Sequence, residues 1–155
     1  AYLWNSQATG ADGTDTLRGI ENLIGSAFND RLDGTNSANS LDGGAGADSL
    51  YGYGGNDTLT GGTGNDVLEG GADADAFLFD AGSGVDLVYN FAAAQGDKIH
   101  LKSGLNGSGI TSAAQALASV TDVGGNATVN LAGGNTITLV GVTTASLVAA
   151  DFVIF

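Results

Sequence analysis

Large apolar residues recur at every ninth position through the middle of the chain. Residues 25–78 divide into six consecutive nine-residue units, and position 8 of each unit is apolar: Leu32, Leu41, Leu50, Leu59, Leu68 and Phe77. Positions 7 to 9 are long enough only for a brief strand, in which position 8 points to one face and its two neighbours point to the other. We therefore expect short strands that each bury one side chain in a shared core.

The other six positions of each unit are typical of a turn. They are rich in Gly, Asn and Asp, which suit positive φ angles and close approach of the backbone. Position 6 holds Asp or Asn throughout: Asp30, Asn39, Asp48, Asp57, Asp66 and Asp75. One turn and one strand make half of a coil, so two units complete a coil of 18 residues. A flexible linker has no need of two columns with one period, so the pattern favours a solenoid.

One related unit precedes the array. Residues 10–18 carry Asp15 at position 6 and Leu17 at position 8, and residues 19–24 then separate this unit from the array. We interpret residues 19–24 as a spacer. The expected organisation has three parts: an N-terminal capping region with one degenerate repeat (1–24), the nonapeptide roll (25–80) and a C-terminal β cap (81–155).

The 18-residue coil predicts two columns of acidic side chains. Asp30, Asp48 and Asp66 fall on one edge of the solenoid, and Asn39, Asp57 and Asp75 fall on the other. Adjacent coils lie about 4.8 Å apart, so stacked carboxylates repel one another unless a cation lies between them. Ca²⁺ takes about 6–8 oxygen ligands, more than two Asp side chains supply, and backbone carbonyls in the Gly-rich turns can complete the set.

The charge of the chain limits the classes of molecule that it is expected to bind. The 155 residues include 17 acidic and only four basic side chains, for a formal net charge of −13. This balance argues against nucleic acids and anionic membranes, which bind through positive fields. No apolar stretch approaches the length of a membrane span, and the absence of Cys excludes a disulfide. Residues 1–10 lack the pattern of a signal peptide, and we interpret the sequence as part of a longer protein.

No catalytic motif stands out. The sequence contains no HExxH, GxSxG or phosphate-binding loop motif, and the nine-residue period of the carboxylates assigns them to a metal. His100 is the only His, and its alternating surroundings in KIHLK predict an ordinary strand residue. We therefore expect a protein that is not an enzyme.

The repeats resemble the calcium-binding nonapeptides of the RTX family. The chain is similar to the C-terminal regions of serralysin-type proteases and to the R-modules of mannuronan epimerases. The resemblance implies an all-β parallel β-roll, a calcium-binding solenoid that binds about four or more Ca²⁺ ions. Each ion lies between turns two units apart: the earlier turn offers the carbonyls of positions 2 and 4 with its Asp, and the later turn those of positions 1 and 3 with its Asp.

Carried onto this sequence, the resemblance implies the following ligands. Gly44, Gly46 and Asp48 would face Gly61, Thr63 and Asp66, while Tyr53, Gly55 and Asp57 would face Gly70, Ala72 and Asp75. Ser26, Phe28 and Asp30 would face Gly43, Ala45 and Asp48, while Thr35, Ser37 and Asn39 would face Gly52, Gly54 and Asp57. Gly62 and Gly64 are also candidate ligands, and Asp15 is a candidate at a terminal site with Asp30.

The segment after the array also resembles the family. Asp86 and Asp97 are similar to the acidic residues that follow the last coil. Residues 111–119 predict a short helix, and residues 127–142 predict a β-hairpin with a Gly-Gly-Asn turn. The final residues 151–155, DFVIF, resemble the uncleaved signal of type I secretion, although they also fit an edge strand packed on the roll.

These features predict a calcium-binding RTX module at the end of a larger secreted protein, which folds on Ca²⁺ binding after export. The expected partners are Ca²⁺, the type I secretion machinery and an upstream domain of the same protein. The alternative is an extracellular adhesion, S-layer or polysaccharide-binding module.

Overall fold

The chain folds into two long sheets that lie face to face. A computed structural model describes residues 6–7, 16–17, 21–80, 82 and 84–155. The first sheet contains, in spatial order, β1 (Ser6–Gln7), β3 (Asn22–Ile24), β5 (Ser40–Asp42), β7 (Thr58–Thr60), β9 (Ala76–Phe79), β11 (Lys98–Leu101) and β15 (Phe152–Ile154). The second contains β2 (Thr16–Leu17), β4 (Arg31–Thr35), β6 (Ser49–Gly54), β8 (Val67–Ala72), β10 (Val85–Tyr89), β14 (Thr136–Leu139), β13 (Asn126–Asn130) and β12 (Val120–Val123).

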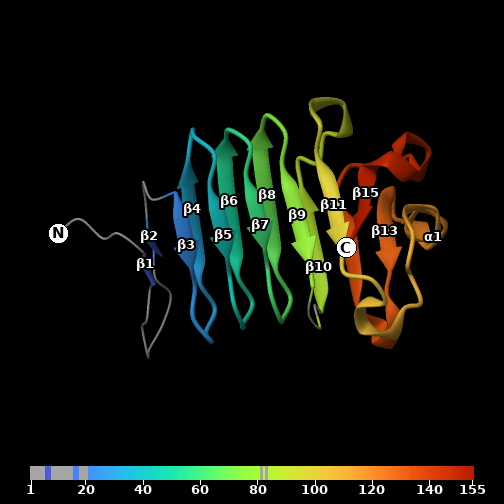
Figure 1. Cartoon of the computed structure of the whole chain (residues 1–155), viewed down its shortest axis with the longest axis horizontal. Coiled ribbons are helices and arrows are strands. Elements are labelled where there is room, and N and C mark those ends of the chain that lie inside the picture. The colour runs from blue at the N-terminus through green and yellow to red at the C-terminus, as the bar shows by residue number, and fades with distance from the viewer. Residues whose placement is uncertain (1–5, 8–15, 18–20, 81, 83) are drawn as a thin grey trace.

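Through the array, successive strands alternate between the two sheets, and every strand pairs in parallel with the strand one coil away. The coils stack along the long axis of the molecule, and the turns line two edges, upper and lower in Figure 1. This arrangement is a parallel β-roll, so the predicted fold class is confirmed. It follows from the sequence because each nine-residue unit supplies one strand and one turn, which together make half of one coil.

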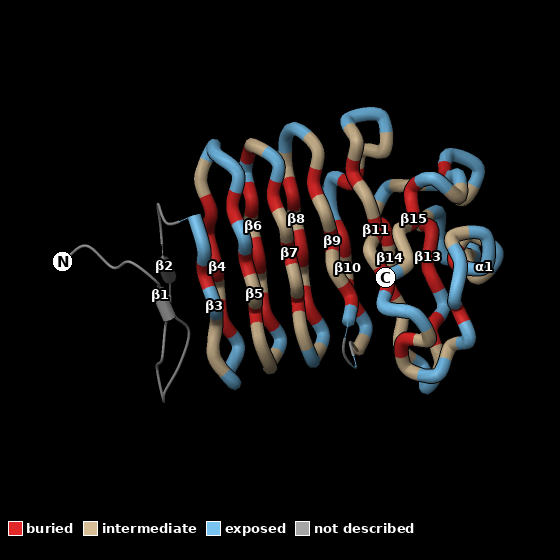
Figure 2. The backbone as a smooth tube through the Cα atoms, in the orientation of Figure 1, coloured by how far each residue is buried: buried red, intermediate tan, exposed pale blue. Residues whose placement is uncertain are grey.

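The apolar position of each unit forms a continuous column inside the roll. Pairing stacks Leu23, Leu41, Leu59, Phe77, Ile99 and Phe152 in the first sheet. It stacks Leu32, Leu50, Leu68, Val88 and Leu139 in the second. All of these side chains are buried, and Figure 2 shows buried and less buried positions alternating along the strands. Burying each such side chain contributes about 1.5–3 kcal/mol.

The interpretation of residues 19–24 as a spacer is wrong, because β3 lies within them. Leu23 pairs with Leu41 in the apolar column of the first sheet. The Glu21 carbonyl accepts a hydrogen bond from the Ser40 amide at 2.7 Å, as the carbonyls of position 6 do in later units. Residues 21–24 therefore belong to a shortened unit, with Glu21 in the place of position 6 and Leu23 in the place of position 8.

A compact cap follows the last coil, at the right in Figure 1. Helix α1 (Ala113–Ala118) begins after Ser112, whose hydroxyl accepts the Gln115 amide. Strands β12, β13 and β14 pair antiparallel, so the predicted helix and hairpin are both present. The cap region also contains the 3₁₀ helices η1 (Ala93–Gln95), η2 (Leu105–Gly107), η3 (Ala132–Gly134), η4 (Thr144–Ser146) and η5 (Ala149–Asp151).

The cap continues both sheets of the roll. Strand β14 pairs in parallel with β10, and β15 pairs in parallel with β11. Residues 151–155 thus include an edge strand, as one of the two interpretations of this segment predicted. In the part of the chain that the structure describes, no helix has the length and apolar character needed to cross a membrane.

Candidate calcium site

The acidic residues at position 6 form two hydrogen-bonded columns. On one edge, Asp48 Oδ1 accepts the Asp30 amide at 2.7 Å, and Asp66 Oδ1 accepts the Asp48 amide at 2.9 Å. On the other edge, Asp57 Oδ1 accepts the Asn39 amide at 2.7 Å, and Asp75 Oδ1 accepts the Asp57 amide at 2.9 Å. All six residues are buried. One oxygen of each of Asp48, Asp57, Asp66 and Asp75 therefore accepts an amide of the preceding coil.

Both columns extend beyond the array. Asp86 Oδ1 accepts the Asp66 amide and Asp97 Oδ1 accepts the Asp75 amide, each at 3.0 Å. These contacts join residues 20 and 22 positions apart rather than 18. A strict nine-residue count misses the two acids. The sequence signal that finds them is an acid two positions before a buried apolar residue, as in Asp86–Val88 and Asp97–Ile99.

The second oxygen of several column residues is buried without a partner. Among the described residues, this holds for the Oδ2 atoms of Asp48, Asp57, Asp66 and Asp75. A buried polar atom without a hydrogen bond costs about 1–3 kcal/mol, and more when it is charged. These four atoms therefore need either protons or a cation.

Two of these oxygens, Asp48 Oδ2 and Asp57 Oδ2, lie near a backbone carbonyl from the next coil. A Cβ atom added to Gly43 would lie 2.5 Å from Asp48 Oδ2 and 2.6 Å from the Gly61 carbonyl oxygen. A Cβ atom at Gly52 would meet Asp57 Oδ2 and the Gly70 carbonyl oxygen in the same way. Glycine at position 1 thus leaves room where a carboxylate and a carbonyl from turns two units apart converge.

The glycines of turn 43–48 and turn 61–66 bring the two backbones into close register. Gly44 and Gly46 have φ angles of 91° and 131°, and Gly62 and Gly64 have almost the same angles, 94° and 130°. The Thr63 amide donates to the Gly44 carbonyl, and the Gly46 amide donates to the Thr63 carbonyl, both at 2.9 Å. The structure therefore places together the residues that the sequence predicted for this site.

The opposite edge repeats the arrangement. In turn 52–57, Tyr53 and Gly55 have φ angles of 76° and 88°. Strand pairing sets Tyr53 opposite Gly71 and Gly54 opposite Ala72, while Asp75 Oδ1 holds the Asp57 amide. A non-glycine residue at positive φ is strained, so the fold keeps Tyr53 in this conformation at some cost.

Sequence and structure comparisons agree on the family. The model of the RTX calcium-binding nonapeptide repeat matches residues 15–50, 24–59 and 51–86. The solution structure of the AlgE6R3 subunit of a mannuronan C5-epimerase from Azotobacter vinelandii is 37% identical, covering 84% of this chain and 80% of that chain with a TM-score of 0.65. The chain belongs to the RTX calcium-binding family.

Two further solved structures resemble this RTX chain. The AlgE6R2 subunit from the same organism is 30% identical, covering 84% of this chain and 91% of that chain with a TM-score of 0.59. The extracellular lipase LipA of Serratia marcescens is 17% identical and shares the fold, covering 94% of this chain and 40% of that chain with a TM-score of 0.51. No curated protein matches the sequence.

The donor chemistry of the RTX columns fits a hard cation. Within the described part of the chain, no three His, Cys, Asp or Glu side chains gather into a group that could hold a metal ion. A cation at the columns would therefore take most of its ligands from backbone carbonyls, with carboxylates from two turns. An all-oxygen set of this kind suits Ca²⁺ rather than Zn²⁺, which favours nitrogen and sulfur.

Burial makes the ionised carboxylates unfavourable when no cation is bound. It raises the pKa of Asp48, Asp57 and Asp75 to about 6, and it also raises the pKa of Asp66. The amide that each carboxylate accepts opposes this shift, and nearby carboxylates add to it at Asp48, Asp57 and Asp75. The pKa values of the column are therefore sensitive to any cation placed beside it.

The remaining candidates lie at the start of the array. The Ala45 amide donates to the Ser26 carbonyl at 3.0 Å, so turn 25–30 and turn 43–48 are also adjacent. Asp30 Oδ1 is the atom that in Asp48 accepts the amide of the preceding coil, and it is buried with no hydrogen-bond partner among the described residues. Asp15 lies outside the described residues, although its neighbour Thr16 pairs with Arg31.

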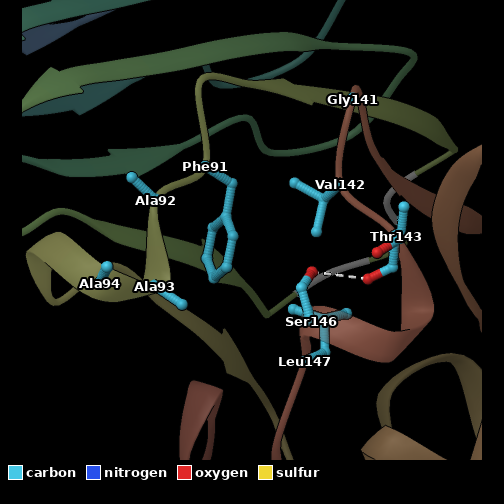
Figure 3. Close-up of a pocket in the computed structure, with 9 residues that line it drawn as sticks. All are labelled: Phe91, Ala92, Ala93, Ala94, Gly141, Val142, Thr143, Ser146 and Leu147. Atoms are coloured by element: carbon cyan, nitrogen blue, oxygen red, sulfur yellow. Dashed lines mark hydrogen bonds between the residues drawn. The ribbon is translucent and has the colours of Figure 1, made fainter.

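Two other features lie away from the columns. His100 is on β11, opposite Leu78 of β9 and Val153 of β15, and burial lowers its pKa. A cavity of about 430 Å³ lies between η1 and η4 in the cap (Figure 3). It is lined by Phe91, Ala92, Ala93, Ala94, Gly141, Val142, Thr143, Ser146 and Leu147, none of which is a candidate ligand.

Proposed function

We propose that this chain is a calcium-triggered folding module of a larger secreted protein. The observation that carries the proposal is the set of buried, unpartnered Oδ2 atoms of Asp48, Asp57, Asp66 and Asp75 in the two columns. Ca²⁺ binding would satisfy these atoms only in the folded roll, because the two turns of a site meet only there. Ligand binding to the native state alone shifts the folding equilibrium.

We assign two sites to the four regular turns. The first joins Gly44, Gly46 and Asp48 to Gly61, Thr63 and Asp66. The second joins Tyr53, Gly55 and Asp57 to Gly70, Ala72 and Asp75. At about ten times its dissociation constant, each bound ion adds about 1.4 kcal/mol. Two ions then add about 3 kcal/mol, a large part of the stability of a small domain.

Circular dichroism tests this proposal directly. We expect little β signal in EGTA and a cooperative gain when Ca²⁺ is added in millimolar amounts. Mg²⁺ is the matched control, because it prefers strict octahedral geometry at about 2.0–2.1 Å and keeps its water ligands. A β spectrum that is the same in EGTA, or equal folding in Mg²⁺ and Ca²⁺, would contradict the proposal.

The setting that we propose is export through a type I system. Ca²⁺ is scarce in the cytosol, so the self-repelling chain would remain unfolded there and would fold outside the cell. Residues 151–155 would then act as the export signal in the unfolded chain and as part of the first sheet afterwards. Deletion of these residues should reduce secretion while the protein is still made. Because the deletion also removes β15, Leu101→Ala is the control, since it weakens the same sheet and leaves the terminus intact. Equal secretion of the deletion variant and the parent would contradict this role.

A second candidate is polysaccharide binding, favoured by the outer face of the second sheet. Tyr51, Glu69 and Tyr89 form one row across β6, β8 and β10. Tyr89 is 38% exposed, and the Asn90 side chain donates to Glu69 at 2.6 Å. Exposed aromatic rings beside polar groups suit sugar rings, and two structural relatives are subunits of an epimerase named for mannuronan.

The charge of the chain decides which sugar to test. Arg31 forms a salt bridge with Asp33 at 2.7 Å and stacks on the Tyr51 ring at 4.1 Å, so this basic group is already engaged. A polyanion would meet a net charge of −13. Calorimetry in Ca²⁺ with a neutral oligosaccharide and a mannuronate oligosaccharide tests both forms, and Tyr89→Ala should abolish the heat of binding. No heat with either sugar would exclude this candidate.

A further inference from the structure

The first coil of the array, residues 25–42, has two turns that differ from the four turns that follow. The later turns have positive φ angles at positions 2 and 4: Gly44 at 91°, Gly46 at 131°, Tyr53 at 76°, Gly55 at 88°, Gly62 at 94°, Gly64 at 130°, Gly71 at 108° and Asp73 at 78°. The corresponding residues of the first coil are Ser26, Phe28, Thr35 and Ser37. All four are described, and none of them has a positive φ. The backbone that frames the regular site is therefore absent from these two turns.

A serine closes the first of these turns. Asp30 Oδ2 accepts the Ser26 amide at 2.6 Å and the Ser26 hydroxyl at 2.9 Å. The same hydroxyl oxygen accepts the Phe28 amide at 3.2 Å. Ser26 thus donates two hydrogen bonds to the turn-facing oxygen of Asp30, and its hydroxyl oxygen accepts the Phe28 amide.

A threonine closes the second turn in the same way. Asn39 Oδ1 accepts the Thr35 amide at 2.7 Å and the Thr35 hydroxyl at 3.4 Å. The Thr35 hydroxyl oxygen accepts the Ser37 amide at 3.1 Å. The acid at position 6 is here replaced by its neutral amide, so this turn has no charge for a cation to neutralise. The two turns lie on opposite edges and are closed by the same pattern of hydrogen bonds.

The first turn and the regular turns differ in the hydrogen bonds of one equivalent atom, the carboxylate oxygen nearest position 1. The oxygen nearest position 1 is Oδ2 in Asp30 and in Asp48, since a Cβ added to Gly25 or Gly43 would lie 2.8 Å or 2.5 Å from it. In Asp30 this atom accepts two hydrogen bonds, whereas Asp48 Oδ2 has no partner among the described residues. Position 2 accounts for the difference, because Gly44 has no hydroxyl group and its amide donates to Asp42 Oδ1 at 3.1 Å instead.

We propose that the first coil, residues 25–42, closes its turns with the hydroxyl groups of Ser26 and Thr35 in place of cations. Calcium binding then begins at turn 43–48, and the first coil is a cation-independent base on which the calcium-dependent coils assemble. This inference rests on the proposed calcium-binding function and narrows it to particular turns. It separates two sets of residues that one sequence pattern treats alike.

Counting bound ions by native mass spectrometry in Ca²⁺ tests the inference with two matched variants of one column. Asp30→Asn keeps an oxygen for Ser26 and should leave the number of bound ions unchanged. Asp48→Asn removes the charge from a regular turn and should lower the number by at least one. A loss of ions in Asp30→Asn equal to that in Asp48→Asn would overturn the inference while leaving calcium binding intact. A parent protein that binds no Ca²⁺ would overturn the proposed function as well.

A gain of binding provides the converse test. Ser26→Gly combined with Phe28→Gly gives turn 25–30 the glycines of turn 43–48 and removes the competing hydroxyl group. The double variant should bind one more Ca²⁺ ion than the parent, with circular dichroism in Ca²⁺ as the control for folding. A folded double variant with the parent's number of ions would overturn the inference.

Discussion

The roll and the cap share two continuous sheets but treat their buried polar groups differently. In the cap, Thr128 and Thr138 join their hydroxyl groups at 3.2 Å. Asp151 accepts the Val148 amide at 2.8 Å and Lys98 Nζ at 3.4 Å. In the described part of the roll, the Oδ2 atoms of Asp48, Asp57, Asp66 and Asp75 have no such partners.

This difference shows that two regions joined by continuous sheets can be stabilised by different kinds of interaction. The cap buries apolar side chains from a helix and an antiparallel hairpin, and protein groups satisfy its buried Thr128 and Asp151, while Asn106 Nδ2 has no partner among the described residues. Each 18-residue coil of the roll buries only two large apolar side chains together with two members of the acidic columns. The buried carboxylate of the cap is therefore held by protein groups, whereas the unpartnered carboxylate oxygens of the regular coils need a proton or a cation.

The largest expected effect compares one glycine from each region. Gly62 in the roll has a φ of 94°, and a Cβ there would meet the Gly44 carbonyl oxygen. Gly134 in the cap has a φ of 82°, and nothing lies within 4 Å of its Cβ position. Gly134→Ala should therefore cost only the left-handed strain of about 1–2 kcal/mol. Gly62→Ala should cost about 2–5 kcal/mol, because overpacking adds to that strain. The measurement is urea unfolding of both variants in saturating Ca²⁺, and equal losses would contradict the close stacking of the turns.

A smaller effect compares two aspartates. Asp48→Ala removes a charged ligand of the first proposed site, and Asp122→Ala removes an exposed cap carboxylate that accepts the Gly125 amide. Loss of one ion at ten times its dissociation constant costs about 1.4 kcal/mol. The Ca²⁺ midpoint of folding, followed by circular dichroism, should rise several-fold for Asp48→Ala and stay near the parent value for Asp122→Ala. Equal midpoints for the two variants would contradict a role of the column carboxylates in Ca²⁺ binding.

The smallest expected effect is a dependence on pH confined to the roll. The pKa of Asp48, Asp57 and Asp75 is about 6 in the folded chain without a cation, above the ordinary value for Asp. Protonation therefore favours folding without Ca²⁺: this stabilisation is complete below about pH 4 and is lost as the pH rises through about 6. In EGTA the β signal should increase between pH 7 and pH 5. The Ca²⁺ midpoint of folding should fall over the same interval, because protonation already stabilises the roll and less Ca²⁺ is then needed. A β signal in EGTA and a midpoint that are both independent of pH would contradict this effect.

Much of the roll follows from local sequence. The leucines at position 8 and the aspartates at position 6 lie where the 18-residue coil predicts, because parallel pairing preserves the period. The same period, counted back from Leu32, reaches Leu23 and would have identified residues 21–24 as part of a shortened unit. A nine-residue count does not reach Asp86 and Asp97, because the spacing between successive members of each column lengthens to 20 and 22 residues there.

Other features depend on contacts that no repeat pattern encodes. The turns at Ser26 and Thr35 occupy the same positions as the regular turns, yet one hydroxyl group changes the hydrogen bonds of each. In the cap, the sequence predicts the hairpin, since its strands are adjacent in the chain. The parallel pairing of β14 with β10 and of β15 with β11 joins segments about 50 residues apart, which local patterning does not determine.

Hydrogen exchange of the backbone amides tests the central claim most directly, that cations in the carboxylate columns hold the regular coils together. We predict that amides of β6, β7 and β8 are protected in Ca²⁺ and lose that protection in EGTA, and that Mg²⁺ does not restore it. Equal protection of these three strands in EGTA and in Ca²⁺ would contradict the account.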